Sequence, residues 1–204
     1  MRIGIIGSGH IGGTLTRRFS ELGHEVKVAN TRWPDSLREL AEETGATPTT
    51  PEDAIAGAEL VVIAVPLRAV PDLPSLDGKL VVDANNYYPG RDGQIAEIDG
   101  GKASSRWVAD QHPGATVTKA FNTINWRNLL ADGREHGDPQ RIAIPIAGDD
   151  EAAKATVSGL VDAIGFDPVD SGSLDDSRHQ EPGTPVYGAN LNAERTRAAL
   201  AAAG

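Results

Sequence analysis

Residues 2–12 of the chain, RIGIIGSGHIG, decide the fold that the sequence predicts. The segment Arg2–Ile6 is short, apolar and rich in β-branched residues, which is typical of a buried strand. Apolar residues then recur every three or four positions from about Ile11 to Leu22, so a helix follows directly, and Glu25–Ala29 is the next strand. Strand, turn, helix and strand span 28 residues, from 2 to 29, close to the roughly 30 of a unit that binds a dinucleotide.

The turn between the first strand and the helix carries the pattern G-x-G-x-x-G. The first glycine makes the tight turn, the second lets the backbone approach a diphosphate, and the third lets the helix pack on the sheet. Because a helix begins here, its free N–H groups are available to phosphates. A turn whose glycines only shape the chain is the alternative interpretation. The cofactor-binding residues predicted in this turn are Gly7, Ser8, Gly9, His10, Ile11 and Gly12.

The end of the second predicted strand indicates which dinucleotide is bound. A site for NAD usually has Asp or Glu here to accept the ribose 2′-hydroxyl. This strand is followed by Asn30, Thr31 and Arg32, and no acid stands between Glu25 and Asp35. A carboxylate would repel a 2′-phosphate, whereas a hydroxyl and a guanidinium bind one through charge-assisted hydrogen bonds. We therefore predict NADP; the alternative is that Arg32 is an ordinary solvated residue.

Short β-branched segments alternate with helical patterns along nearly the whole chain. This predicts a Rossmann-type α/β fold: a doubly wound, mostly parallel sheet with helices on both faces and a short C-terminal helical extension. Beyond the first unit, strands are expected at residues 60–65, 80–83, 116–120, 141–147 and 167–171. Helices are expected at residues 34–44, 104–111, 150–164 and 192–203. The connection 172–190 is longer than most loops of compact domains. It is therefore expected either to be mobile or to be packed by a ligand or a second subunit.

The composition excludes several classes of protein. The 204-residue chain has 29 Asp and Glu against 19 Lys and Arg, a formal net charge of −10, and no cysteine. Disulfide scaffolds, thiolate metal sites and thiol nucleophiles are therefore excluded, and the acidic balance argues against nucleic acid or an anionic membrane as partner. The longest apolar run, Leu60–Leu67, is too short to span a bilayer, and the N-terminal segment lacks the apolar core of a signal peptide. We expect a cytoplasmic protein.

Aromatic residues and asparagines follow several predicted strands, where ligands of open α/β sheets lie. The aromatic residues, which either stack on a cofactor ring or pack within the loops, are Trp33, Tyr87, Tyr88, Phe121 and Trp126. The asparagines, which also favour turns for local reasons, are Asn85, Asn86, Asn122 and Asn125. Asn122 follows its strand closely enough to face a nicotinamide.

We predict no catalytic acid or base and no metal ligand. The histidines lack metal-ligand spacing, and no nucleophile stands near a base in the sequence. His10 belongs to the glycine turn, His24 to a helix end, and the remaining histidines to polar loops: His112, His136 and His179. Hydride transfer between two stacked rings needs no acid from the protein, because proximity and orientation supply much of the barrier reduction.

At residues 1–12, 30–32 and 119–124 (KAFNTI) the sequence resembles the NADPH-dependent coenzyme F-420 reductases, also called F-420-dependent NADP oxidoreductases. Residues 144–150 and 171–178 are similar too, so the resemblance spans nearly the whole chain. It implies reversible hydride transfer, in a homodimer, between NADP(H) and a deazaflavin coenzyme, F-420, that lies across the nicotinamide. Another small acceptor, such as a ferric chelate, an imine or a quinone, is the first alternative. A non-catalytic NADP sensor is the second.

The same resemblance implies roles for individual residues. Ser8, Thr31 and Arg32 would hold the 2′-phosphate, and residues 9–11 the diphosphate. Val65 and Pro66 would flank the adenosine or nicotinamide ribose, and Asn122 would lie near the redox centre.

The predicted domain organisation follows from the chain's length. Residues 1–171 would form the NADP-binding domain, and residues 172–204 a loop and helix that complete the substrate site or a dimer interface. The chain is too short for the further helical domain, of about 100 residues, that many NADP reductases carry. An anionic acceptor needs local positive potential in this acidic chain. We expect this potential from four arginines: Arg127, Arg134, Arg141 and Arg178.

Overall fold

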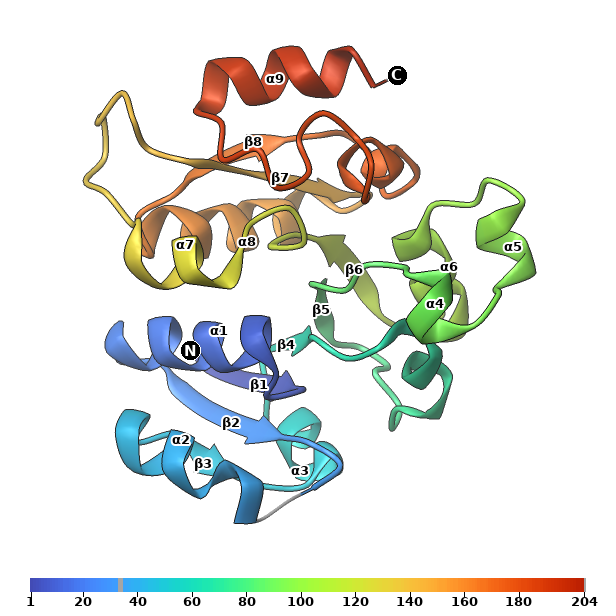
Figure 1. Ribbon diagram of the computed structural model, residues 1–204. Helices are drawn as coiled ribbons and strands as arrows, with labels where there is room; N and C mark the ends of the chain where they lie inside the picture. The colour runs from blue at the N-terminus through green and yellow to red at the C-terminus, as the bar shows by residue number, and fades with distance from the viewer. Residues whose placement is uncertain (33–34, 204) are drawn as a thin grey trace.

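A mostly parallel β-sheet runs through the centre of the molecule (Figure 1). The computed structural model describes residues 1–32 and 35–203. The strands in this part of the chain are β1 (Arg2–Ile6), β2 (Glu25–Ala29), β3 (Thr47–Pro48), β4 (Leu60–Ile63), β5 (Leu80–Asp83), β6 (Thr116–Lys119), β7 (Ala143–Gly148) and β8 (Asp167–Asp170). Their order is β3-β2-β1-β4-β5-β6-β7-β8, and neighbours are parallel except for the antiparallel pair β6 and β7. The order reverses between β1 and β4, which confirms the predicted doubly wound arrangement.

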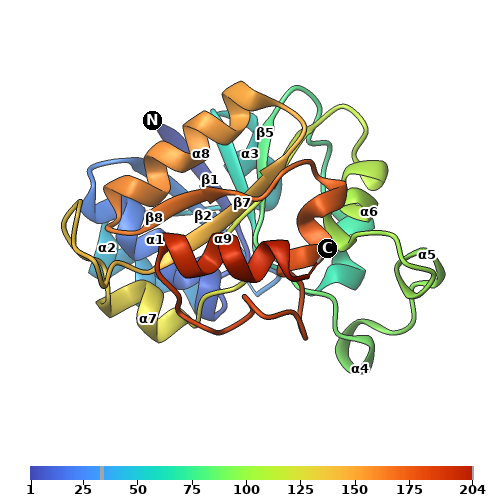
Figure 2. The ribbon, with the colours of Figure 1, turned by 90° about the horizontal axis from the view of Figure 1, so that it is seen from above.

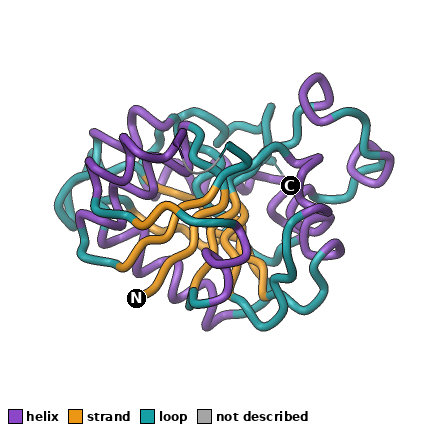
Figure 3. Tube along the Cα trace, turned by 90° about the horizontal axis from the view of Figure 1, so that it is seen from below, coloured by secondary structure: helices purple, strands orange, loops and turns teal. Residues whose placement is uncertain are grey.

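Helices cover both faces of the sheet (Figure 2 and Figure 3). The α-helices of the described ranges are α1 (His10–Glu21), α2 (Arg38–Thr44), α3 (Pro51–Ala56), α4 (Pro89–Asp92), α5 (Ala96–Asp99), α6 (Ser104–Gln111), α7 (Trp126–Ala131), α8 (Glu151–Ala163) and α9 (Ala193–Ala201). Three 3-10 helices accompany them in the same ranges: η1 (Asp35–Leu37), η2 (Leu67–Asp72) and η3 (Asp175–Gln180). The bounds of β1, β2, β5 and α6 are those predicted from the sequence.

Two apolar cores lie on opposite faces of the sheet, because successive strand residues point to opposite sides. Val62 packs into the core that Phe19 of α1 and Val157 of α8 also fill. Its neighbour Val61 packs into the other core, with Trp107 of α6. Because the strands are buried on both faces, their sequences are continuous apolar runs.

The region after β2 differs from the prediction. The helix predicted over residues 34–44 begins as the 3-10 turn η1 and becomes an α-helix only at Arg38; Pro34 and the aromatic candidate Trp33 lie outside the described residues. β3 and α3 were not predicted from the sequence. A signal for α3 was present, because the Thr50 side chain accepts a hydrogen bond from Asp53 N at 3.3 Å and a proline stands at the first helical position.

The segment 172–190, predicted as a loop, is packed against the sheet by its own side chains. It contains η3, in which Ser177 and Gln180 are fully buried. Gln180 accepts a hydrogen bond from the Ser171 hydroxyl at 2.6 Å and donates one to the Pro145 carbonyl at 3.3 Å. These contacts between distant residues, which the sequence pattern does not show, order the segment.

The C-terminal helix α9 lies over β7 and β8 (Figure 2). Its Leu200 packs with Val186 and Val169, while α8 covers the opposite face of the two strands. Asp150 and Asn192 cap α8 and α9 through their side chains, as the predicted starts of these helices suggest. Within residues 1–32 and 35–203, no helix combines the length and the apolar character that crossing a membrane requires.

Candidate functional site

A groove of about 470 Å³ lies at the carboxyl ends of β1, β4, β5 and β6. Ligands of open α/β sheets bind in this position, beside the point where the strand order reverses. The groove brings together the predicted residues Gly9, His10, Ile11, Val65, Pro66, Asn85 and Asn122. It also contains Arg91 and Tyr187, which the sequence analysis did not assign to the site.

A second hollow of about 400 Å³ adjoins the groove at the start of α1. Gly9, His10 and Trp126 line both spaces, whereas Ser8 and Ser36 line only the second. The site therefore offers one space on each side of the helix N-terminus. This arrangement suits a ligand in which a diphosphate joins two ring systems.

The glycine turn has the geometry that a diphosphate needs. Gly7 has a φ of +105°, and a Cβ on Gly12 would stand 1.8 Å from the Gly7 carbonyl oxygen, so helix and turn are in closest contact. A Cβ on Gly9 would meet nothing within 4 Å. No side chain of the described ranges caps α1 at Gly9. The N-terminal N–H groups of a 12-residue helix thus face the groove unshielded, and these residues fit a bound dinucleotide.

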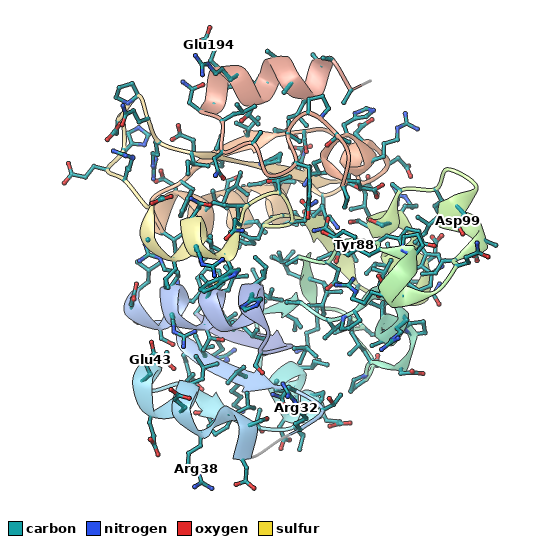
Figure 4. The ribbon with its side chains drawn as sticks, viewed as in Figure 1. Arg32, Arg38, Glu43, Tyr88, Asp99 and Glu194 are labelled. Atoms are coloured by element: carbon teal, nitrogen blue, oxygen red, sulfur yellow. The ribbon has the colours of Figure 1, made fainter. Side chains whose placement is uncertain are left out.

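The predicted phosphate-selecting residues lie beyond β2, around the Asn30 side chain. Its Nδ2 donates to the Ser8 hydroxyl at 2.6 Å and to the Ser36 hydroxyl at 3.0 Å, and its Oδ1 accepts from Arg32 N at 2.8 Å. Asn30 therefore ties the glycine turn to the segment after β2. Arg32 and Thr31 are exposed, and Figure 4 shows Arg32 beyond the end of β2.

An aromatic stack separates the two hollows. The His10 and Trp126 rings are 4.8 Å apart and inclined by only 5°, and the Arg127 guanidinium carbon lies 4.6 Å from the centre of the Trp126 ring. Trp126 begins α7, a helix that the sequence analysis missed. Its signal was Asn125, whose side chain caps α7 by accepting from Arg127 N at 2.9 Å.

Asn85 lines the groove and has a buried carboxamide with one unused donor. It is 4% exposed. Its Oδ1 accepts from Val65 N at 2.7 Å, and within residues 1–32 and 35–203 its Nδ2 has no hydrogen-bond partner. β4 ends at Ile63 and does not reach residue 65 as predicted, and the Val65 N–H bonds the Asn85 side chain in place of a neighbouring strand. A buried donor without a partner costs free energy that a ligand oxygen would recover.

Asn122 lies in the groove with both of its amide hydrogens engaged. Its Nδ2 donates to Asn86 Oδ1 at 3.0 Å and to the Gln180 carbonyl at 2.7 Å, and its Oδ1 accepts from Gln180 Nε2 at 3.0 Å. The preceding residue, Phe121, has a φ of +64°, a left-handed conformation that reverses the chain after β6. Asn122 thus joins three segments that are remote in the sequence.

Aromatic side chains close the far end of the groove. Tyr88 and Tyr187 meet through their hydroxyl groups, and the Arg91 guanidinium lies over the Tyr88 ring, 5.0 Å from its centre (Figure 4 labels Tyr88, beside α4). Burial and the hydrogen bond with Tyr88 raise the pKa of Tyr187 to about 12. Burial raises the pKa of Asp92, but hydrogen bonds from Arg91 and from Tyr88 N hold it below its ordinary value overall. Asp92 therefore balances the charge of Arg91.

Two residues serve packing where the sequence suggested exposed roles. Arg141, expected to supply positive potential, is 2% exposed and bonds Asp162 and Asp167 at 2.7 and 3.0 Å. Because both carboxylates balance its charge, Arg141 adds no field at the groove. His112, expected in a polar loop, is buried with its Nε2 2.9 Å from the Val70 carbonyl. Across the described ranges, no three His, Asp or Glu residues are grouped so that they could hold a metal ion.

The fold and the groove define a Rossmann-type protein with a site for a dinucleotide. Comparison with known families finds that residues 2–87 match the family described as NADP oxidoreductase coenzyme F420-dependent. Over these residues the chain is similar to a family of NADP-dependent oxidoreductases.

Relatives and solved structures extend the similarity beyond residue 87. The metalloreductase STEAP3 of Rattus norvegicus is 33% identical over 184 residues, which are 88% of this chain and 36% of that protein. The F420-dependent NADP reductase of Methanothermobacter thermautotrophicus is 28% identical, over 94% of this chain and 89% of that protein. The crystal structure of a hypothetical protein, SMa0349 from Sinorhizobium meliloti, superposes with a TM-score of 0.81 at 32% identity, over 94% of this chain and 95% of that one. The chain thus spans about a third of the metalloreductase.

Proposed function

We propose that this protein transfers a hydride between NADP(H) and the deazaflavin coenzyme F-420. The observation that carries the proposal is the uncapped start of α1 at Gly9, with one hollow toward Ser8 and Ser36 and the other toward Asn85. The absence of an acid directly after β2 supports NADP over NAD. The reductase of Methanothermobacter thermautotrophicus, similar over nearly its whole length, supports the deazaflavin as second substrate.

Each part of the site then has a separate task. The N–H groups at the start of α1, in residues 9–11, bind the diphosphate, and Ser8 with Thr31 and Arg32 holds the 2′-phosphate. Val65 and Pro66 flank a ribose. Bound NADPH supplies the hydride, and the protein contributes orientation and exclusion of water.

The acceptor occupies the aromatic end of the groove in this proposal. Tyr88 comes from the loop after β5, and Tyr187 from the segment after β8, so residues 172–204 complete the acceptor site as one wall of it. Because Asp92 balances Arg91, this end favours a flat, hydrogen-bonding ring over a small acid. The resemblance seen in the sequence implies a homodimer, which analytical ultracentrifugation of the purified chain tests.

The acceptor is tested by mixing the protein with NADPH and coenzyme F-420 and following the deazaflavin absorbance. The proposal predicts that the oxidised deazaflavin band disappears as NADPH is consumed. Bound NADPH without turnover refutes the acceptor and leaves the dinucleotide site in place. Turnover of a ferric chelate under the same conditions would favour the second candidate, which the 33% identity to a metalloreductase supports.

The cofactor is tested by calorimetry with NADPH and NADH. Arg32→Ala should lower NADPH affinity by about tenfold or more, because a phosphate loses a charged partner worth about 1.5–3 kcal/mol, and should leave NADH affinity unchanged. Arg38→Ala is the matched control, since Arg38 is also an exposed arginine of this region and already pairs with Asp35. A preference for NADPH that survives Arg32→Ala would remove Arg32 from the proposal.

A further inference from the structure

A buried ion pair lies directly behind the groove. Lys119 ends β6 and Asp83 ends β5, and the two residues are register partners on adjacent strands. Both side chains are fully buried, with Lys119 Nζ 3.1 Å from Asp83 Oδ2. Ser105 of α6 donates a further hydrogen bond to the same carboxylate oxygen at 2.6 Å. Burying two charges costs free energy that their attraction only partly returns, so such a pair is weakly explained by stability alone.

Both members of the pair hold the backbone of Asn85. Lys119 Nζ donates to the Asn85 carbonyl at 2.5 Å, and Asn85 N donates to Asp83 Oδ1 at 3.0 Å. Val65 N donates a hydrogen bond to Asn85 Oδ1, so Asn85 is fixed at its backbone N–H, its backbone carbonyl and its side-chain oxygen. The remaining polar group, Nδ2, is the one that lacks a partner in the described part of the chain. The contacts therefore restrict Asn85 to one orientation and leave one donor unused.

We propose that Lys119, Asp83 and Ser105 are positioning residues that hold the Asn85 carboxamide so that its N–H binds an oxygen of the nucleotide, a carbonyl or hydroxyl of its nicotinamide half. The inference rests on the proposed function, and it concerns the half of the groove remote from Ser8 and Ser36. A donor fixed before binding loses little conformational entropy when the ligand arrives. Asn122, whose amide hydrogens are both engaged, has no comparable donor to offer.

A double-mutant cycle on NADPH affinity tests the proposal without any turnover. Asn85→Ala is made in the wild type and in the neutral background Asp83→Asn with Lys119→Met. Replacing both members of a buried ion pair by uncharged groups of similar size is often neutral or stabilising, so this background should fold. Circular dichroism melting checks the fold. Arg32→Ala, at the phosphate end, serves as the matched control in both backgrounds.

The expected result is a coupled effect. Asn85→Ala lowers NADPH affinity about tenfold in the wild type, the size of one good hydrogen bond. In the neutral background the effect is less than about twofold, because the Asn85 backbone has lost its two charged partners. The control Arg32→Ala lowers the affinity by the same factor in both backgrounds, because distant sites act additively. If the neutral background does not fold, Ser105→Ala replaces it and gives the same pattern at smaller amplitude.

Two results would overturn the inference. One is an equal effect of Asn85→Ala in both backgrounds, which makes the ion pair a purely structural element. The other is an Asn85→Ala variant that binds NADPH as the wild type does. In either case NADPH still binds the wild-type protein. Failure of the proposed function shows differently, as no binding of NADPH to the wild type or as bound NADPH without turnover of the deazaflavin.

Discussion

The glycine turn yields a prediction in which two glycines three residues apart behave in opposite ways. In Gly12→Ala the new Cβ would stand 1.8 Å from the Gly7 carbonyl oxygen, where ordinary contact begins at 3.4 Å. The obstacle is backbone, so helix α1 must move away from the turn by more than 1 Å. Overpacking of this kind costs about 1–3 kcal/mol and occasionally more, and we expect about 3 kcal/mol. For a chain of this length that lowers the Tm by about 6–12 °C.

Gly9→Ala is the matched partner of this variant. Its Cβ would meet nothing within 4 Å, and the Gly9 backbone φ of −69° is open to alanine. Its Tm should therefore stay within about 2 °C of the wild-type value. The methyl group, however, projects where the backbone must approach the diphosphate, so NADPH affinity should fall at least about tenfold, or about 1.4 kcal/mol.

Thermal melting by circular dichroism and calorimetric titration with NADPH measure the two effects separately. A Gly12→Ala protein that melts within about 2 °C of the wild type would refute the close contact between helix and turn. A Gly9→Ala protein that binds NADPH as tightly as the wild type would refute the assignment of the open space to the diphosphate.

Further predictions concern residues around the groove and the distal sheet. Burial raises the pKa of Tyr187 from 10.0 to about 12, so its neutral phenol stabilises the fold fully below pH 10, and this stability is lost as the pH rises to 12. The Tm of Tyr187→Phe should therefore depend less on pH between 10 and 12 than the wild-type Tm does. The same pH dependence in both proteins would contradict this prediction. Asn122→Leu should lower the free energy of unfolding by about 3 kcal/mol, because buried Gln180 loses its side-chain partner. Calorimetry should then show a Tm about 6–12 °C below that of the wild type. Arg141→Met should lower the free energy of unfolding by about 2 kcal/mol, as urea unfolding would measure. This is less than the loss from breaking a fully buried ion pair, because Asp162 is half exposed.

Local patterns sufficed for the central strands and for the nucleotide turn. The β1 and β5 segments are apolar on both faces, so burial alone specifies them as strands. The glycine spacing predicted the turn geometry at residues 7–12, because each glycine is required by a local steric constraint that is visible in the sequence. The short elements β3, α3 and α7 escaped notice, since two to six residues are too few for a periodic signal.

The acceptor half of the groove depends on contacts between residues that are remote in the sequence. Asn122 and Gln180 are 58 positions apart and Tyr88 and Tyr187 are 99 apart, yet each pair is in direct contact. The sequence could nominate asparagines and aromatic residues after strands, but it could not say which amide hydrogens the protein itself would use.

The amino-acid sequence by itself determined the strand–turn–helix unit, the helix-covered parallel sheet and the edge of the sheet at which the groove lies, because these follow from periodicity, burial and glycine sterics over a few residues. Only the tertiary structure decided that Arg141 is buried between carboxylates, that segment 172–190 is packed, and that Asn85 Nδ2 finds no partner among residues 1–32 and 35–203. The physical reason is that hydrogen-bond satisfaction and charge balance depend on which distant groups the fold brings together.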